Sequence, residues 1–205
     1  MANVLLARHG NTFGPGDKIV WVGAREDLPL VEKGEAQARA LGEALAAAGM
    51  RPARIISGPL KRTRRAAEIV AELTGFDGEV RIDDRLKEID YGAWGGKSDE
   101  EIIANWGEEA LAVWRDEHRR PPGADWTPSE EALAANARAV LAEASKGEGL
   151  SLVITSNGIL RYMYAALSGP AEDAKVKTGH VCGAKANERL FWNLKPEDAP
   201  LSDLR

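Results

Sequence analysis

Short runs of consecutive apolar residues alternate along the chain with longer stretches in which apolar residues recur at helical spacing. The run at residues 4–7 leads directly into Arg-His-Gly, which is typical of a buried strand that opens into a loop. Apolar residues of the stretch 32–48 fall on one helical face, and Gly49 marks the end of that helix. The same criteria predict strands at 54–57, 80–82 and 152–155, helices at 60–73, 129–145 and 159–167, and a final hairpin over 181–194 with Asn187 near its turn.

Two segments interrupt this alternation with glycine and proline. Residues 10–29 contain four glycines and two prolines and are expected to form a loop. Residues 92–128 combine glycines and prolines with helical stretches at 99–106 and 108–119, and we interpret this segment as a helical flap inserted over one end of the sheet. Four of the six tryptophans lie in the flap and are expected mainly to pack inside it: Trp94, Trp106, Trp114 and Trp126.

Strands that alternate with helices predict an α/β fold, a three-layer sandwich whose mainly parallel sheet is flanked by helices. We expect residues 1–205 to form one domain that carries the flap as an insertion. In such sheets, ligands bind beyond the carboxyl ends of the strands. Arg8 and His9 follow the first strand, and Ser156 and Asn157 follow the strand at 152–155, so these two pairs are expected to lie at the binding edge.

Composition narrows the class of partner. The net charge of −5 argues against a nucleic-acid partner, which normally needs a basic face. The apolar runs are too short to span a membrane, the N-terminus has no signal-peptide pattern, and Cys182 is the single cysteine, so we expect a cytoplasmic protein with no membrane partner. The three histidines are scattered without the spacing of a metal motif, so neither a metal nor another cofactor is expected.

The tripeptide Arg8-His9-Gly10 carries the first chemical signal. A histidine fixed at a strand end, with glycine leaving room beside it, can present one ring nitrogen to an electrophile and form a covalent intermediate. The planar guanidinium of Arg8 suits phosphate oxygens. Taken alone, this tripeptide fits a structural histidine better than a nucleophile.

Several segments, in order, resemble the histidine phosphatase superfamily, the phosphoglycerate mutase-like enzymes. They lie between residue 3 and about residue 161, and their order makes the resemblance far more specific than any single segment. The matching segments are 8–10, 27–30 with 34–38, 57–63, 86–94 and 153–161.

The resemblance implies a metal-independent phosphatase that hydrolyses a small phosphomonoester. It implies that His9 accepts the phosphoryl group and that Arg8 and Arg62 hold the phosphoryl oxygens, where charge collects in the transition state. Glu88 would be the proton donor to the leaving alcohol, a role that needs a carboxyl group with a raised pKa. The expected ligand is therefore a small phosphorylated substrate or inorganic phosphate.

Other residues near these motifs are candidates for lesser or rival roles. Asn11 and Thr12 are candidate hydrogen-bond donors to phosphate, although an ordinary loop role fits them as well. Three carboxylates compete with Glu88 for the role of proton donor: Asp83, Asp84 and Asp90.

The chain departs from the family pattern after the strand at 152–155. Family members usually carry His-Gly there, whereas this chain has Ser156-Asn157-Gly158. The missing imidazole would donate a charge-assisted hydrogen bond, a contribution of roughly 1.5–3 kcal/mol or about 10- to 150-fold in rate. Ser156 can still donate a neutral hydrogen bond, and the amides that start the next helix, beginning near Asn157, can face an anion, so both are candidate phosphate ligands. Ser156 also fits the N-cap of that helix.

The two remaining histidines do not obviously replace the missing one. His118 is expected to be a solvated helix residue, and His180 lies in a tail segment that can return to the edge of the sheet. The leading alternative to a phosphatase is therefore a phosphate-binding or regulatory protein that has lost turnover. A phosphoglycerate-type mutase is a weaker alternative, because those enzymes generally carry longer insertions. The sequence leaves the substrate and the oligomeric state open.

Overall fold

The computed structural model describes residues 3–170 and 173–205, which contain a six-stranded sheet in the order β3-β2-β4-β1-β5-β6. Strands β1 to β4 pair in parallel, and β5 is antiparallel to both of its neighbours, β1 and β6. The mainly parallel sheet predicted from the sequence is therefore confirmed, with one reversed strand. The strands are β1 (Asn3–Arg8), β2 (Arg54–Ser57), β3 (Arg81–Ile82), β4 (Leu150–Thr155), β5 (Val181–Lys185) and β6 (Glu188–Leu194).

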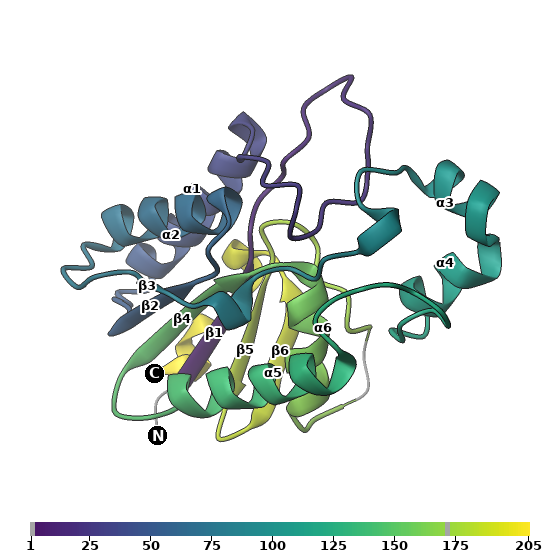
Figure 1. Ribbon diagram of the computed structural model, residues 1–205. Helices are drawn as coiled ribbons and strands as arrows, with labels where there is room; N and C mark the ends of the chain where they lie inside the picture. The colour runs from purple at the N-terminus through teal and green to yellow at the C-terminus, as the bar shows by residue number, and fades with distance from the viewer. Residues whose placement is uncertain (1–2, 171–172) are drawn as a thin grey trace.

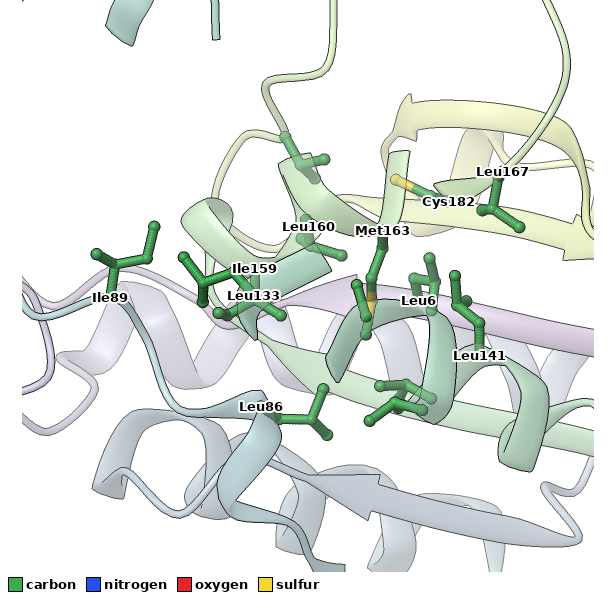
Figure 2. Close-up of a cluster of buried hydrophobic side chains, with 14 of the residues drawn as sticks. Leu6, Leu86, Ile89, Leu133, Leu141, Ile159, Leu160, Met163, Leu167 and Cys182 are labelled. Carbon is green, nitrogen blue, oxygen red and sulfur yellow. The ribbon is translucent and has the colours of Figure 1, made fainter. Parts of the chain in front are cut away.

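Helices cover both faces of the sheet (Figure 1). The helices α1 (Glu32–Ala47) and α2 (Lys61–Thr74) pack together on one face, and α5 (Glu130–Ala144) and α6 (Asn157–Ala166) pack together on the other. Side chains of β1 alternate between the two layers, since successive residues of a strand point to opposite faces. Leu5 joins the hydrophobic cluster under α1 and α2, whereas Leu6 joins the cluster under α5 and α6 (Figure 2). The arrangement is the expected three-layer sandwich.

Local signals place most element ends within two residues of their predicted positions. The side chain of Ser129 accepts a hydrogen bond from the amide of Ala132 and caps α5. The hairpin of β5 and β6 turns at Ala186 and Asn187, both with positive φ. The helix predicted at 108–119 was too long, because α4 (Glu108–Arg115) ends four residues earlier and the chain turns at His118, whose φ is +57°.

The flap (residues 92–128) leaves and rejoins the rest of the chain at one point. It carries α3 (Asp99–Trp106) and α4, which lie to one side of the sheet in Figure 1. At its base the amide of Asp90 donates to the carbonyl of Thr127 at 2.9 Å, and the amide of Thr127 donates back at 3.0 Å. This two-way bridge joins the residues just before and at the end of the flap.

Among the residues that the structure describes, the helices are too short or too polar to span a membrane.

An aromatic cluster fills the space between the flap and the loop that follows β1. Its rings contact one another mostly edge to face, with centroids 4.9–6.3 Å apart. Its members are Trp21, Tyr91, Trp94, Trp114 and Trp126. Three of the four flap tryptophans therefore pack as expected, each only 3% exposed, whereas Trp106 is 41% exposed.

Replacing Trp126 by alanine is expected to lower the free energy of unfolding by about 3–5 kcal/mol, because it empties the centre of this cluster. Equilibrium urea unfolding measures the change. The matched control is Trp106→Ala, which removes a half-exposed ring and is expected to cost less than about 1 kcal/mol. Equal losses in the two variants would contradict the assignment of Trp126 to the core.

Candidate functional site

A cleft of about 740 Å³ opens beyond the carboxyl ends of β1 and β4. Its walls come from the loop after β1, from α2, from the segment before the flap, from the flap, from α6 and from the loop before β5. Seven of the eight site residues expected from the sequence line it: Arg8, His9, Asn11, Thr12, Arg62, Glu88 and Asn157. The fold thus brings these seven residues together from four separate parts of the chain.

His9 is held in one orientation by its two ring nitrogens. Nδ1 lies 2.7 Å from the carbonyl oxygen of Gly10. Because a carbonyl oxygen only accepts, Nδ1 carries the proton and Nε2 keeps its lone pair. The Nε–H group of Arg62 donates to that lone pair at 3.2 Å. Burial, and then the charges of Arg62 and Arg8, hold the pKa of His9 well below its ordinary value, so the ring is neutral at neutral pH.

Arg62 reaches this position from the first turn of α2 and is 1% exposed. Its Nη1 donates to the carbonyl of Glu26 at 2.9 Å, and its Nη2 donates to the carbonyl of Gly23 at 3.0 Å. These bonds fix the loop after β1 against α2 and aim the Nε–H group at His9. Arg62 therefore positions the ring as well as bringing positive charge to the site.

Arg8 supplies the second buried guanidinium. Its Nη1 donates to the carbonyl of Val176 at 2.6 Å, while its Nε has no hydrogen-bond partner among the described residues. Burial lowers the pKa of Arg8, and the nearby carboxyl group of Glu88 opposes the shift. A guanidinium stays protonated in proteins, so Arg8 and Arg62 together create a strongly positive end of the cleft.

Glu88 lies in the segment before the flap and is 6% exposed, and its carboxyl group contacts the first turn of α6. Its Oε2 accepts from the amide of Gly158 at 3.2 Å, and its Oε1 accepts from the amide of Ile89 at 3.0 Å. Burial raises the pKa of Glu88 above its ordinary value, although these two amides and the nearby arginines oppose the shift. A carboxyl group with a raised pKa is suited to donate a proton.

Gly158 is the residue that makes room for this carboxyl group. A Cβ at position 158 would lie 2.3 Å from Oε1 of Glu88 and 2.8 Å from the hydroxyl of Tyr91. Both distances are far below van der Waals contact, so any side chain here would displace Glu88. The glycine therefore fixes how closely α6 approaches the acid.

The three rival carboxylates lie elsewhere. The Arg85 guanidinium holds the pKa of Asp83 at about 2, which keeps that carboxyl group ionised. Asp84 is exposed, and Asp90 forms an ion pair with Arg25 at 2.7 Å. None of the three is among the described residues that line the cleft.

Ser156 is the expected site residue that does not line the cleft. The parallel register pairs Arg8 with Thr155, so the next residues, His9 and Ser156, lie side by side where the two strands end. Ser156 occupies the N-cap position of α6, as predicted, but its side chain makes no capping hydrogen bond. The side chain is fully buried, and its Oγ has no hydrogen-bond partner in the described part of the chain.

The two asparagines of the site are held through their carbonyl oxygens. Oδ1 of Asn157 accepts from the amide of Val176 at 2.9 Å, and Oδ1 of Asn11 accepts from the hydroxyl of Thr178. Each side chain therefore keeps its amide NH₂ group as the donor, which is the group that an anion needs. Thr12 lines the cleft next to Asn11.

Arg161 is a site residue that sequence reasoning missed. It lies on α6 and lines the cleft, where its guanidinium stacks 4.6 Å from the ring centroid of Trp114. Its Nη1 donates to the carbonyl of Trp114 and contacts Nδ1 of His118 at 2.6 Å. His118 is thus half-buried outside any helix, and its prediction as a solvated helix residue was wrong. The position of Arg161 three residues after Gly158, within the matching segment 153–161, was the available signal.

His180 lies outside the cleft as far as the described lining residues show. Its Nδ1 lies 2.9 Å from the carbonyl oxygen of Asn193, and its own carbonyl accepts from the amide of Arg8 at 3.0 Å. His180 thus returns to the edge of β1 through its backbone. Among the described residues, no group of three or more His, Cys, Asp or Glu side chains is placed to hold a metal ion.

Comparison with known proteins agrees with this geometry. The chain is 32% identical over 170 residues to a 2,3-bisphosphoglycerate-dependent phosphoglycerate mutase of Methylobacterium sp. (strain 4-46), covering 81% of this chain and 80% of the mutase. It is 36% identical over 125 residues to the mutase of that name from Thermobifida fusca (strain YX), covering 60% of this chain but only 49% of that relative.

Among solved structures, a mycobacterial glucosyl-3-phosphoglycerate phosphatase in complex with VO₃ superposes with a TM-score of 0.76 at 25% identity, covering 94% of this chain and 99% of that one. The sequence profile of the histidine phosphatase superfamily (branch 1) matches residues 4–185. This chain is therefore a member of the histidine phosphatase superfamily.

Proposed function

We propose that the protein hydrolyses a small phosphomonoester through a phosphohistidine on His9. The observation that carries the proposal is the fixed neutral ring: Nδ1 bonded to Gly10 leaves Nε2 with a lone pair, and Arg62 points at that lone pair. In the reaction, Nε2 forms a bond to phosphorus as the bond from phosphorus to the leaving oxygen breaks. Arg8 and Arg62 stabilise the charge on the equatorial oxygens, and the amide groups of Asn11 and Asn157 add neutral donors.

Glu88 completes both half-reactions. Its carboxyl group gives a proton to the leaving alkoxide in the first half. The resulting carboxylate takes a proton from the water that attacks the phosphohistidine, which releases inorganic phosphate and restores both His9 and Glu88. Burial of Glu88 supports this role, because the raised pKa keeps the proton available.

The relatives include a phosphatase and mutases, so they support phosphoryl transfer without deciding between hydrolysis and mutase activity. The mycobacterial phosphatase is matched over 99% of its length, whereas 80% of the Methylobacterium mutase and 49% of the Thermobifida mutase are matched. The structure of the mycobacterial phosphatase contains VO₃, an oxyanion that resembles a phosphoryl group during transfer. The better agreement in length is the observation that favours a phosphatase over a mutase.

The test is a phosphate-release assay with a panel of phosphomonoesters in the presence of a chelator. Release that is unaffected by the chelator is the expected result. Binding of inorganic phosphate without turnover of any substrate would instead favour a phosphate-binding or regulatory protein, the reading that the serine at position 156 supports. Transfer of phosphate between positions of phosphoglycerate, with little release, would favour the mutase.

Replacing Ser156 by alanine is expected to change kcat/KM by less than about twofold, because its buried side chain does not line the cleft. Because the Oγ has no partner among the residues that the structure describes, the same change is expected to leave the free energy of unfolding equal or higher. Activity assays and urea unfolding measure the two effects. A loss of roughly 2- to 13-fold in kcat/KM, the value of one neutral hydrogen bond, would instead show that Ser156 donates to the phosphoryl group.

A further inference from the structure

The cleft has an apolar wall that phosphate chemistry does not require. It comes mainly from the loop after β1, with one ring from the flap: Phe13, Ile19, Val20, Trp21, Val22 and Trp114. Exposure rises from 7% at His9 to 63% at Ile19. The positive end is therefore deep, and the apolar wall runs from Trp114, which is 3% exposed, out to Ile19 at the mouth.

Ile19 is exposed on a segment that is fixed on both sides. Lys18 forms an ion pair with Glu101 of α3 at 2.8 Å. On the other side, Trp21 exchanges backbone hydrogen bonds with the segment before α3, donating to the carbonyl of Lys97 at 2.8 Å and accepting from the amide of Gly96 at 2.9 Å. In Figure 1 this loop rises from β1 and passes beside the segment that leads to α3. The ion pair of Lys18 and the backbone hydrogen bonds of Trp21 thus hold the two apolar residues between them, Ile19 and Val20, at the cleft.

The size of the cleft also indicates a ligand larger than a phosphate group. A volume of about 740 Å³ lies in the range typical of sites for ligands the size of a drug molecule, well above what a bare phosphate group fills. The apolar wall is part of the lining that surrounds this volume. Apolar surface gains free energy when a ligand removes it from water, roughly in proportion to the area covered.

We propose that the substrate is a phosphomonoester of an apolar alcohol, whose aromatic or branched hydrocarbon body packs against Ile19 and Val20 while its phosphate reaches His9. This inference rests on the proposed function and names its substrate class. The proposed substrate differs from phosphoglycerate, the phosphorylated acid after which the related mutases are named. Charged side chains also line the cleft: Asp99, Glu100, Arg115 and Lys175. The exposed Lys175 would pair with a carboxylate on a substrate such as 3-phosphoglycerate.

The first experiment compares substrates that differ in the body and not in the chemistry. Benzyl phosphate and 2-phenylethyl phosphate are assayed against glycerol 3-phosphate and 3-phosphoglycerate, all of which release an alkyl alcohol. The arylalkyl esters are expected to have kcat/KM values at least about tenfold higher, through lower KM. An equal or higher value for 3-phosphoglycerate overturns the inference and assigns the mouth of the cleft to Lys175 and a carboxylate.

A pair of isoleucine variants locates the effect. Ile19→Ser is expected to lower the ratio of kcat/KM for 2-phenylethyl phosphate over glycerol 3-phosphate by at least about fivefold. Ile103 on α3 is also an exposed isoleucine, 39% exposed, but it does not line the cleft, so Ile103→Ser is the matched control and is expected to keep the ratio. An unchanged ratio in Ile19→Ser contradicts the proposed wall.

A binding measurement separates this inference from the proposed function. Calorimetry compares 2-phenylethylphosphonate with methylphosphonate, neither of which can be hydrolysed. A dissociation constant at least about tenfold lower for the arylalkyl compound supports the apolar subsite, even if no phosphomonoester were turned over and the proposed function had failed. Equal dissociation constants reject the subsite even if phosphate release is rapid.

Discussion

Replacing His9 by alanine is expected to reduce kcat/KM for every phosphomonoester by roughly 10⁴- to 10⁶-fold, the scale set by loss of a covalent nucleophile. No other described side chain presents a neutral imidazole to the cleft, because His118 contacts Arg161 and His180 lies at the edge of β1. The parent protein, quenched in base during turnover, is expected to carry the mass of one phosphoryl group. The variant is expected to carry none.

His180→Ala is the matched control for this prediction. It removes an imidazole that contacts the carbonyl oxygen of Asn193 and does not line the cleft, and it is expected to retain full turnover and the phosphoryl adduct. Thermal unfolding of both variants shows whether they are folded. Turnover that survives in His9→Ala would reject the phosphohistidine mechanism, and an adduct lost in His180→Ala would move the nucleophile to the other histidine.

Replacing Glu88 by glutamine is expected to lower kcat by about 10²- to 10⁴-fold for alkyl phosphates, because the amide cannot give up a proton to the leaving alkoxide. The loss is expected to be less than about tenfold for 4-nitrophenyl phosphate, whose leaving group departs without protonation. Steady-state kinetics with both kinds of ester measure the difference. Equal losses for the two kinds would contradict the role of Glu88 as the acid.

The pH profile gives a second sign of the same role. Glu88 must be protonated to act, so kcat/KM falls as the pH rises through its raised pKa, and this limb is expected to be absent in Glu88→Gln. His9 must be neutral, so kcat/KM also falls as the pH drops through the lowered pKa of His9, and this limb is expected to remain. Asp84→Asn, which changes an exposed rival carboxylate, is expected to keep both limbs.

Local chemistry explains which parts of the molecule were predictable. Apolar runs such as residues 4–7 and capping signals such as Ser129 act within a few residues, and the elements that they predict are confirmed. The motif order also led to His9, Arg62 and Glu88, which the fold brings to one cleft. These residues lie just after or at the start of a strand or helix, so a local sequence pattern also fixes their position in the fold.

Contacts between distant segments explain what was missed. The length of α4 was overestimated because no local signal shows that the chain turns at His118 to meet Arg161, 43 residues later. The place of Arg161 in the matching segment 153–161 was a signal, but its contact with the cleft depends on Trp114, which lies 47 residues earlier on the flap. The apolar wall was equally invisible, because Ile19 is anchored through Trp21 to a segment more than 70 residues away.

The bridge between Asp90 and Thr127 has a consequence for how this protein can change over evolutionary time. Because the two ends of the flap are already joined, adding or deleting residues between them costs little closure entropy: each doubling of loop length costs only about 0.6 kcal/mol. His9, Arg8 and Arg62 all lie outside the bridged interval, and Glu88 lies just before it. Insertions and deletions in the flap are therefore expected to be tolerated where they spare the packing of Trp114 and Trp126, and to change the length and lining of the cleft while His9, Arg8, Arg62 and Glu88 stay where they are.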